Sequence, residues 1–435
     1  MRRAREKSRK ALAAAREAEI SIERIGAQGD GVGLLEGRPV YVPYSVPGDR
    51  LRVRVLGAKG DGLAGEATEL LSAGATRVEP PCPHFGRCGG CALQQLADAA
   101  YGDWKQRLLG EALARRGLRD VTIRPLVRIA AGSRRRARFA AGTRGRAVSF
   151  GFHARESHAV VDIETCLLLV PALVRLIAPL RQALTGLLPP GGRADLEVTA
   201  TETGVDLLIE QAGPPPSAEA RSRLAEMAEA QDLACISWTQ PGQLPEPIAM
   251  RRAPVVLFGG VPVELPPGAF LQPSAEGEAA LLAEAEAALA GAARIADLFA
   301  GCGSFSLPLT RAATIHAVEG DRAAVDALQL AVRRARLGHR VTVERRDLER
   351  APLQPEELKR FDALLFDPPR AGAKAQAESL ARSGLARVVA VSCNPASFAR
   401  DARILVDGGF RLDGARPVDQ FPWSPHLEIV ASFSR

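Results

Sequence analysis

Cys393 is the residue of this chain whose type and position offer the most chemistry. It lies in a Val-Ser-Cys-Asn-Pro segment directly after the apolar run Val388–Val391, which predicts a buried strand that ends at the thiol. In open α/β sheets, ligands bind outside the carboxyl ends of the strands. We therefore interpret Cys393 as a nucleophile. For two other isolated cysteines we expect structural roles: Cys235 in the core, and Cys302 as a small spacer within a glycine turn.

A glycine-containing loop upstream is typical of a nucleotide-type cofactor site. Ala293–Phe299 reads as a strand that ends in Gly301-Cys302-Gly303, and glycines let the backbone approach a ligand closely. The next predicted strand, Ile315–Glu319, ends in an acid that can hold both ribose hydroxyls of a nucleoside. A dinucleotide site would want a third glycine where Ser306 stands, so S-adenosylmethionine fits better than a nicotinamide cofactor. The alternative is a purely structural strand-to-helix turn.

A third polar segment, Asp367-Pro368-Pro369-Arg370, follows the apolar strand 361–366. The prolines fix an extended turn that presents polar groups at a sheet edge. Asp-Pro-Pro is similar to the target-base loop of nucleic-acid methyltransferases. Asp347 is expected on the neighbouring edge, within reach of an adenine ring.

These groups suit methylation of a pyrimidine carbon. Carbon 5 of uracil is a poor nucleophile, but a thiolate that adds to carbon 6 turns it into an enolate carbon able to attack a methyl sulfonium. The thiolate is the reactive form, so we expect the pKa of Cys393 to be lowered locally. A base must then remove the carbon-5 proton. Glu428 is the candidate, because it enters the apolar strand 429–431 and desolvation there raises a carboxyl pKa. The alternative for Glu428 is a surface carboxylate.

The positive charge of the chain is concentrated in one region. The net charge is +7, and between Val121 and Arg155 there are nine arginines and no acidic residue. In the densest piece, Arg alternates with Ala and Phe, which predicts a strand with one buried face and one face of guanidinium groups. Because guanidinium groups bind phosphates and stack on bases, we expect RNA contact rather than a merely solvated face. The expected RNA-contact residues are Arg134, Arg136, Arg138 and Phe270.

Three cysteines are spaced C-x5-C-x2-C at Cys82, Cys88 and Cys91, and Cys166 lies far downstream. Thiolates at such spacing hold zinc or an iron–sulfur cluster. Spacing alone makes zinc at least as good an interpretation. The fourth ligand is less clearly marked than the first three, since Cys166 can also be a buried thiol and His84 can substitute for it.

The chain of 435 residues has room for about two to four domains. Residues 1–18 read as a basic tail, either helical or frayed. Short alternating runs separated by Gly-rich turns, as in Glu19–Ile25 and Arg50–Val55, predict a small OB-like β-barrel over 19–77. An Ala/Glu/Leu helix is expected at Ala279–Ala293, and from Arg294 onward strands and helices alternate in doubly wound fashion. No apolar run reaches the roughly 20 residues of a membrane span and no signal peptide is present, so a cytoplasmic protein is expected.

The motifs together resemble the RNA uracil-5 methyltransferases, in particular the bacterial 23S rRNA enzymes with an N-terminal TRAM domain and a [4Fe-4S] cluster. The resemblance covers the chain from about residue 18 to its end, and it rests on DLFAGCG, DPPR, SCNP and FPWSPHLE. The family usually has Asn where Ser274 and Ser304 stand, and His more often than Trp423. Relatives that act on tRNA lack both the cluster and the TRAM domain, which favours rRNA.

The resemblance implies a role for each candidate residue. Cys393 is the nucleophile and Glu428 the base. The residues of the S-adenosylmethionine pocket are Gln272, Phe299, Gly301, Ser304, Glu319, Asp347 and Asp367. The ligands of the [4Fe-4S] cluster, which the resemblance favours over zinc, are Cys82, Cys88, Cys91 and Cys166.

The implied fold is multidomain α/β: a TRAM barrel at 19–77, a small central α/β domain with the cluster at 78–92 and 122–268, and a Rossmann-like catalytic domain at 93–121 and 269–435. The implied enzyme methylates carbon 5 of a uridine that is flipped out of folded 23S rRNA, and it acts as a monomer with no membrane partner. Alternatives are a tRNA substrate, cytosine-5 methylation, or a non-catalytic RNA-binding assembly factor. Cytosine-5 enzymes typically carry a second cysteine in the Asp-Pro-Pro loop, and this loop has none.

Overall fold

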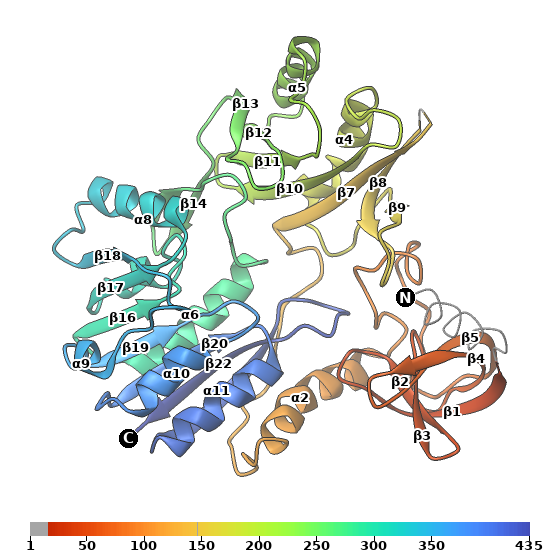
Figure 1. Ribbon diagram of the computed structural model, residues 1–435, viewed down its shortest axis with the longest axis horizontal. Coiled ribbons are helices and arrows are strands. Elements are labelled where there is room, and N and C mark those ends of the chain that lie inside the picture. The colour runs from red at the N-terminus through yellow and green to blue at the C-terminus, as the bar shows by residue number, and fades with distance from the viewer. Residues whose placement is uncertain (1–15, 146) are drawn as a thin grey trace, which may run out of the picture. The chain divides into compact units, whose positions relative to one another are not determined.

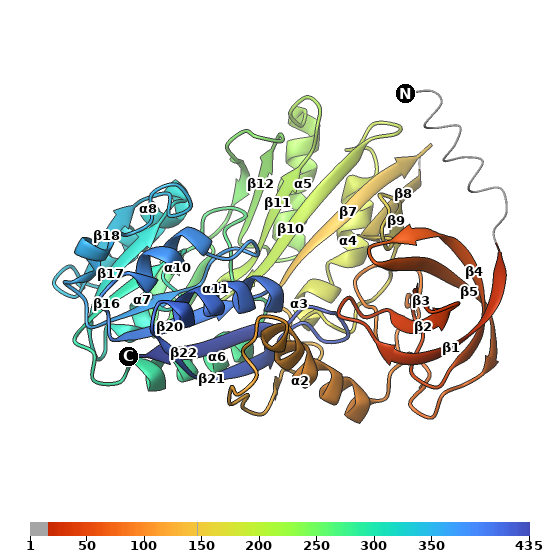
Figure 2. The ribbon, with the colours of Figure 1, turned by 60° about the horizontal axis from the view of Figure 1, so that its bottom comes forward.

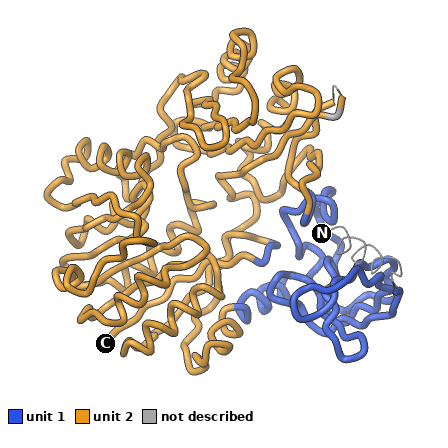
Figure 3. The backbone as a smooth tube through the Cα atoms, in the orientation of Figure 1, with its two compact units in different colours: residues 1–108, 154–156, 423–425 blue, residues 109–153, 157–422, 426–435 orange. Residues whose placement is uncertain are grey.

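The computed structural model describes residues 16–145 and 147–435, which divide into two compact units (Figure 3). Unit 1 comprises residues 1–108, 154–156 and 423–425, and unit 2 comprises 109–153, 157–422 and 426–435. Most of the predicted basic tail, 1–18, lies outside the described residues. Among the described helices, none has the length and apolarity needed to cross a membrane.

Unit 1 contains the predicted barrel, which confirms the interpretation of the alternating runs. Five strands close in the order β1-β2-β3-β5-β4; their bounds are β1 Glu17–Ile25, β2 Gly31–Leu35, β3 Arg38–Val42, β4 Arg50–Lys59 and β5 Gly62–Ser72. Alternate residues such as Ile20, Val40 and Val53 fill the interior. The outward arginines of β4 face glutamates on neighbouring strands; Arg54, for example, lies 3.3 Å from Glu66.

Helix α2 (Asp98–Ala114) follows the cysteine-bearing loop, and its buried side chains form a stripe along one side. Trp104, Leu108, Leu109 and Leu113 recur at helical spacing and are all buried. The helix begins in unit 1, and its last residues, from Leu109, belong to unit 2.

A seven-stranded sheet forms the first half of unit 2, in the order β13-β12-β11-β10-β7-β8-β9. Its strands are β7 Arg136–Arg144, β8 Ala147–His153, β9 Val160–Asp162, β10 Arg193–Thr201, β11 Gly204–Glu210, β12 Cys235–Thr239 and β13 Glu246–Met250. Helices α3 (Pro171–Val174), α4 (Ile177–Leu184) and α5 (Ala218–Ala230) contribute leucines to the core on one face. Ala137 and Phe139 of β7 point into this core, so Arg136 and Arg138 lie on the other face, as their alternation predicts.

An eight-stranded sheet forms the second half, in the order β18-β17-β16-β19-β20-β22-β21-β6. Its strands are β16 Arg294–Leu298, β17 Thr314–Glu319, β18 Val341–Arg345, β19 Ala363–Phe366, β20 Arg387–Ser392, β21 Arg411–Asp419, β22 Glu428–Ser434 and β6 Val127–Arg128. A hairpin, β14 (Val255–Phe258) and β15 (Val261–Glu264), precedes it in the chain. The doubly wound arrangement expected from Arg294 onward is confirmed.

Helices cover both faces of this sheet (Figures 1 and 2). They are α6 Ala275–Leu289, α7 Ser306–Leu309, α8 Arg322–Arg334, α9 Pro355–Leu358, α10 Lys374–Ala381 and α11 Pro395–Asp407. Helix α6 packs against β20, β21 and β22, whereas α10 and α11 lie on the opposite face. The helix expected at Ala279–Ala293 begins earlier, because the Ser274 side chain accepts a hydrogen bond from Gly277 N (3.1 Å) and caps it there.

Strand pairing brings the predicted site residues to one edge. Strands β16 to β20 are parallel, so the residues after Leu298, Phe366 and Ser392 all follow carboxyl ends. Strand β22 runs antiparallel to β20 with Ile429 opposite Ser392. The residue before Ile429, which is Glu428, therefore lies across from Cys393.

Candidate active site

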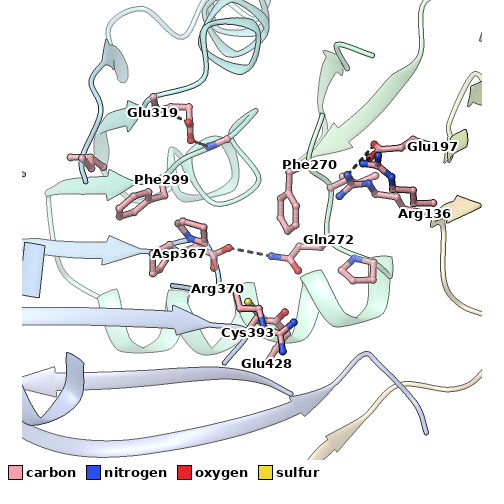
Figure 4. A pocket seen from close by; sticks show the side chains of 18 of the residues that line it. Arg136, Glu197, Phe270, Gln272, Phe299, Glu319, Asp367, Arg370, Cys393 and Glu428 are labelled. Atoms are coloured by element: carbon pink, nitrogen blue, oxygen red, sulfur yellow. Dashed lines mark hydrogen bonds and ion pairs between the residues drawn. The ribbon is translucent and has the colours of Figure 1, made fainter. Parts of the chain in front are cut away.

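A cavity of about 900 Å³ opens at this edge of the eight-stranded sheet, and the far side is lined by residues of β7 and β10 (Figure 4). Of the sequence-predicted residues, it is lined by Arg134, Arg136, Arg138, Phe270, Gln272, Phe299, Gly301, Glu319, Asp347, Asp367, Cys393 and Glu428. Ser304 is the predicted cofactor residue that is not among the lining residues of the cavity.

The backbone of the glycine loop has several positive φ angles, and one of its amides donates to Glu319. Phe299, Gly301 and Gly303 all have positive φ, at 60°, 54° and 97°. The Gly301 N–H donates to one Glu319 carboxylate oxygen at 2.9 Å, and the other oxygen accepts from the amides of Gly320 (2.7 Å) and Asp321 (2.8 Å). Three backbone amides thereby orient the Glu319 carboxylate at the cavity wall.

A second acid, Asp297, lies buried beneath this loop. The Ser306 hydroxyl donates to its Oδ2 at 2.5 Å, while its Oδ1 has no hydrogen-bond partner within the described part of the chain. The pKa of Asp297 is raised to about 7, first by burial and then by the nearby carboxylates of Asp367 and Glu319. Asp297 is the first residue of the DLFAGCG motif, but the motif alone did not indicate a role for this carboxyl group.

Asp367 stands at the end of β19, and the amide of Gln272 donates to its Oδ2 at 3.2 Å. Burial raises the pKa of Asp367 to about 7. The loop that follows is tied to the start of α11, because the Arg370 carbonyl accepts from both Asn394 Nδ2 and Ser397 Oγ, each at 3.1 Å. Arg370 itself lines the cavity and was not predicted as a site residue.

Cys393 lies between the end of β20 and the residue that caps α11, Asn394. Burial raises the pKa of the Cys393 thiol to about 11, and the carboxylates of Glu428 and Asp367 add to the rise. Its own backbone amide and the Arg370 guanidinium act in the opposite direction. The expectation of a lowered pKa is therefore wrong for the ligand-free pocket, because two acids and desolvation outweigh one cation.

Glu428 is the first residue of β22 and only 4% exposed. This burial excludes the surface-carboxylate alternative. Figure 4 shows the Glu428 and Cys393 side chains next to each other at the strand ends.

The arginines of the opposite wall carry carboxylate and aromatic partners. Arg136 lies 3.2 Å from Glu197 and 5.6 Å from the centre of the Phe270 ring, and that ring is 60% exposed. Arg138 lies 2.8 Å from Asp195 and 3.3 Å from Glu197. Sequence reasoning missed these acids, although their alternation on β10 was readable; only the pairing of β10 with β7 shows what they face.

The seven cysteines separate into groups. Cys82, Cys88 and Cys91 lie half-buried in unit 1, and Cys166 lies half-buried in unit 2; none forms a disulfide. Burial raises the pKa of Cys88, and nearby Cys82 adds to the rise. The described residues contain no group of three His, Cys, Asp or Glu side chains arranged to hold a metal ion. Cys235 and Cys302 are buried, as expected.

Comparison with known proteins identifies two regions. Residues 263–435 match the family described as tRNA (Uracil-5-)-methyltransferase, and residues 15–68 match the TRAM domain. The chain is 41% identical over 424 residues to an uncharacterized RNA methyltransferase of Brucella suis biovar 1, covering 98% of this chain and 99% of the relative. It is 37% identical over 434 residues to the 23S rRNA (uracil(1939)-C(5))-methyltransferase RlmD of Chromohalobacter salexigens, covering 96% and 89%.

The fold is also similar to that of Pyrococcus abyssi tRNA (uracil-54, C5)-methyltransferase, solved in complex with S-adenosyl-L-homocysteine. The TM-score is 0.73 at 21% identity, and the match covers 96% of this chain and 100% of that chain. At this identity the likeness concerns the fold, which agrees with the barrel and the doubly wound sheet. The chain belongs to the RNA uracil-5 methyltransferase family, and it carries an N-terminal TRAM domain.

Proposed function

We propose that this enzyme methylates carbon 5 of a uridine in 23S rRNA through a covalent adduct on Cys393, with S-adenosylmethionine as the donor. The observation that carries the proposal is the meeting of a thiol and a buried carboxylate, Cys393 and Glu428, in the cavity that Glu319 and the glycine loop also line. The 37% identical relative named as a 23S rRNA enzyme supports rRNA over the tRNA alternative. We place the reaction in the cytoplasm, with the enzyme acting as a monomer.

The cofactor residues follow from the cavity wall. When bound, S-adenosylmethionine supplies an electrophilic methyl group on a sulfonium. Glu319 accepts hydrogen bonds from the ribose hydroxyls, and Asp347 contacts the adenine. Phe299 and Gly301 shape the loop around the nucleoside, and Gln272 and Asp367 hold the polar remainder. Ser304 does not line the cavity, and we propose that Ser304 supports the glycine loop from behind.

Cys393 and Glu428 then perform the two halves of the reaction. The Cys393 thiolate would add to carbon 6, and the electron pair displaced from the ring double bond would form the bond from carbon 5 to the methyl group as the methyl–sulfonium bond breaks, with S-adenosylhomocysteine as the leaving group. Glu428 accepts the carbon-5 proton, the carbon–sulfur bond breaks, and the ring double bond is restored. Arg370 opposes part of the rise in the pKa of the Cys393 thiol, and the N-terminal end of α11 adds positive potential beside it.

RNA approaches the wall formed by β7 and β10. We propose that phosphates replace the carboxylates that now pair with Arg136 and Arg138, and that Arg134 contacts the same strand. The exposed ring of Phe270 supports the extruded base by stacking, as aromatic side chains do for flipped and single-stranded nucleotides.

The decisive experiment uses RNA that contains 5-fluorouridine. Fluorine cannot leave as a proton, so wild-type enzyme should form a stable covalent adduct with 23S rRNA fragments, whereas Cys393→Ala should bind the RNA without forming one. Nucleoside mass spectrometry of 23S rRNA and tRNA after reaction identifies the substrate. A non-catalytic assembly factor would give neither adduct nor 5-methyluridine, and 5-methylcytidine would identify the cytosine-5 alternative.

We also propose that Cys82, Cys88, Cys91 and Cys166 hold a [4Fe-4S] cluster in a central domain made of residues 78–92 and 122–268, between a barrel at 19–77 and a catalytic domain at 93–121 and 269–435. Four half-buried cysteine side chains, three of them at C-x5-C-x2-C spacing, support a thiolate-bound metal. Anaerobically purified protein should be brown, with broad absorption near ~400 nm. Colourless protein that carries zinc would refute the cluster.

A further inference from the structure

A directional chain of hydrogen bonds runs behind the cavity wall from helix α6 to Asp367. The Gly277 N–H donates to Ser274 Oγ (3.1 Å), and that hydroxyl donates to Gln420 Oε1 (3.5 Å). Gln420 Nε2 then donates to Gln272 Oε1 (2.8 Å), and Gln272 Nε2 donates to Asp367 Oδ2 (3.2 Å). Gln420 thus connects the segment after β21 to the predicted cofactor residues.

The residues in the middle of this hydrogen-bond chain are buried. Gln420 and Gln272 are each 2% exposed, and Ser274 is 1% exposed. A Cβ on Gly277 would lie 2.3 Å from Gln420 Oε1 and 2.7 Å from Ser274 Oγ, so the slot for the Gln420 amide exists only because position 277 has no side chain. Gln272 and Asp367 line the cavity, and Gln420 stands one layer behind them.

The carboxylate end of this hydrogen-bond chain sets the orientation of both amides. An ionised carboxylate can only accept, whereas the Ser274 hydroxyl at the other end can accept from Gly277 N and still either donate or accept toward Gln420. While Asp367 is ionised, Gln272 therefore presents Nε2 to Asp367, and Gln420 presents Nε2 to Gln272. The carbonyl oxygen of Gln272 is then occupied, so the group it offers to the cavity is its second N–H.

We propose that Gln420 is a positioning residue that locks Gln272 as a hydrogen-bond donor toward an acceptor oxygen of the bound ligand, a carboxylate or a carbonyl. This inference rests on the proposed function in one respect, namely that the cavity binds the cofactor and the target base. Gln420 acts through Gln272 and touches neither ligand.

Loss of Gln420 frees the Gln272 amide to rotate by half a turn. Its carbonyl oxygen then faces Asp367, where it repels the ionised carboxylate and accepts a proton from the neutral acid. The charged and titratable groups around Asp367 are Asp297 beneath the loop, Cys393 on the neighbouring strand, Glu428 and Arg370, and none of them replaces the lost donor. Ligand affinity therefore falls, and the pH needed to ionise Asp367 rises.

The test compares Gln420→Met with Gln376→Met. Gln376 is also a fully buried amide, bonded to the backbone of Leu353 at 2.8 and 3.2 Å, and it does not line the cavity. Calorimetry of S-adenosylhomocysteine binding from pH 6 to 9 should show an affinity about tenfold or more lower for Gln420→Met, with its pH midpoint moved upward, and no such change for Gln376→Met. In methyl transfer, KM for the cofactor should rise more than kcat falls.

Two further variants separate positioning from simple loss of stability. Gly277→Ala should reproduce the binding defect although alanine favours the helix, because its Cβ displaces the Gln420 amide. Gln420→Glu should bind better at low pH, where the protonated acid can donate to Gln272, than at high pH. Equal affinity and pH midpoint for Gln420→Met and wild type would overturn the inference alone; wild-type protein that neither binds S-adenosylhomocysteine nor methylates RNA would overturn the proposed function with it.

Discussion

The residues that surround Cys393 favour the protonated form of its thiol. With a pKa of about 11, raised first by burial and then by Glu428 and Asp367, the thiolate is scarce at neutral pH. A scarce thiolate protects the nucleophile from oxidation and alkylation until substrate arrives.

This predicts the reactivity of Cys393 toward iodoacetamide in ligand-free protein. Alkylation at Cys393, followed by peptide mass spectrometry, should be slow at pH 7 and rise about tenfold per pH unit until pH ~10. Glu428→Gln removes one carboxylate, so it should lower the pKa and speed alkylation several-fold at pH 8. The same variant should lose methyl transfer, because it lacks the base.

Arg370→Met provides the opposite control, since loss of the cation should raise the pKa and slow alkylation. A rate for Cys393 that is independent of pH between 7 and 9 would contradict the raised pKa. The apolar strand that Cys393 follows led to its proposed role as nucleophile. The sequence could not predict the sign of the pKa shift, because that depends on Glu428 and Asp367, which arrive from other strands.

At the scale of elements, the loop from Phe299 to Gly303 contains two glycines that have different structural roles. Both have positive φ, but a Cβ on Gly301 would meet nothing within 4 Å, whereas one on Gly303 would lie 2.6 Å from Leu328 Cδ1 of helix α8. Gly301 therefore keeps the cavity open, and Gly303 lets the loop pack on α8.

Alanine at each position should separate binding from stability. Gly301→Ala should cost about 1–2 kcal/mol in the free energy of unfolding through backbone strain, yet weaken S-adenosylhomocysteine binding, because its Cβ stands at the cavity wall. Gly303→Ala should cost more, since it adds a clash with Leu328 to the same strain. Denaturant unfolding and calorimetry measure the two quantities, and equal stability losses for both variants would refute the distinction.

Sequence patterns predicted most elements around the site, because apolar runs mark β16, β17, β19 and β20 and polar motifs mark their ends. They also predicted the barrel from alternation. They did not predict which strands pair, and the carboxylates opposite Arg136 and Arg138 depend on the register of β7 with β10. Gln420 was missed for the same reason, since it acts through residues about 150 positions away in the chain.

At the scale of the molecule, unit 2 buries acids that favour the protonated state. Asp297, Asp367 and Asp206 each have a pKa raised to about 7, in every case first by burial. Asp367 lines the cavity, and Asp297 lies buried beneath the glycine loop. Asp206 on β11 has no role in the proposed reaction, and its Oδ1 lacks a hydrogen-bond partner in the described part of the chain.

Asp206 should therefore make the stability of the protein depend on pH. Its pKa in the folded state, about 7, exceeds the ordinary value of 3.8 for an aspartic acid, so its contribution to stability is present at low pH and is lost as pH rises from about 4 toward 7. Asp206→Asn removes the charge at almost unchanged size. At pH 8 the variant should unfold at a higher denaturant concentration than wild type, with a free energy of unfolding larger by up to about 4 kcal/mol, and the difference should shrink toward pH 4.

The matched control is Glu229→Gln, which replaces an exposed carboxylate on α5 and should show no such trend. A difference between Asp206→Asn and wild type that is the same at pH 5 and pH 8 would mean that Asp206 is not protonated in the native protein, and that a cation or water outside the described contacts stabilises its charge.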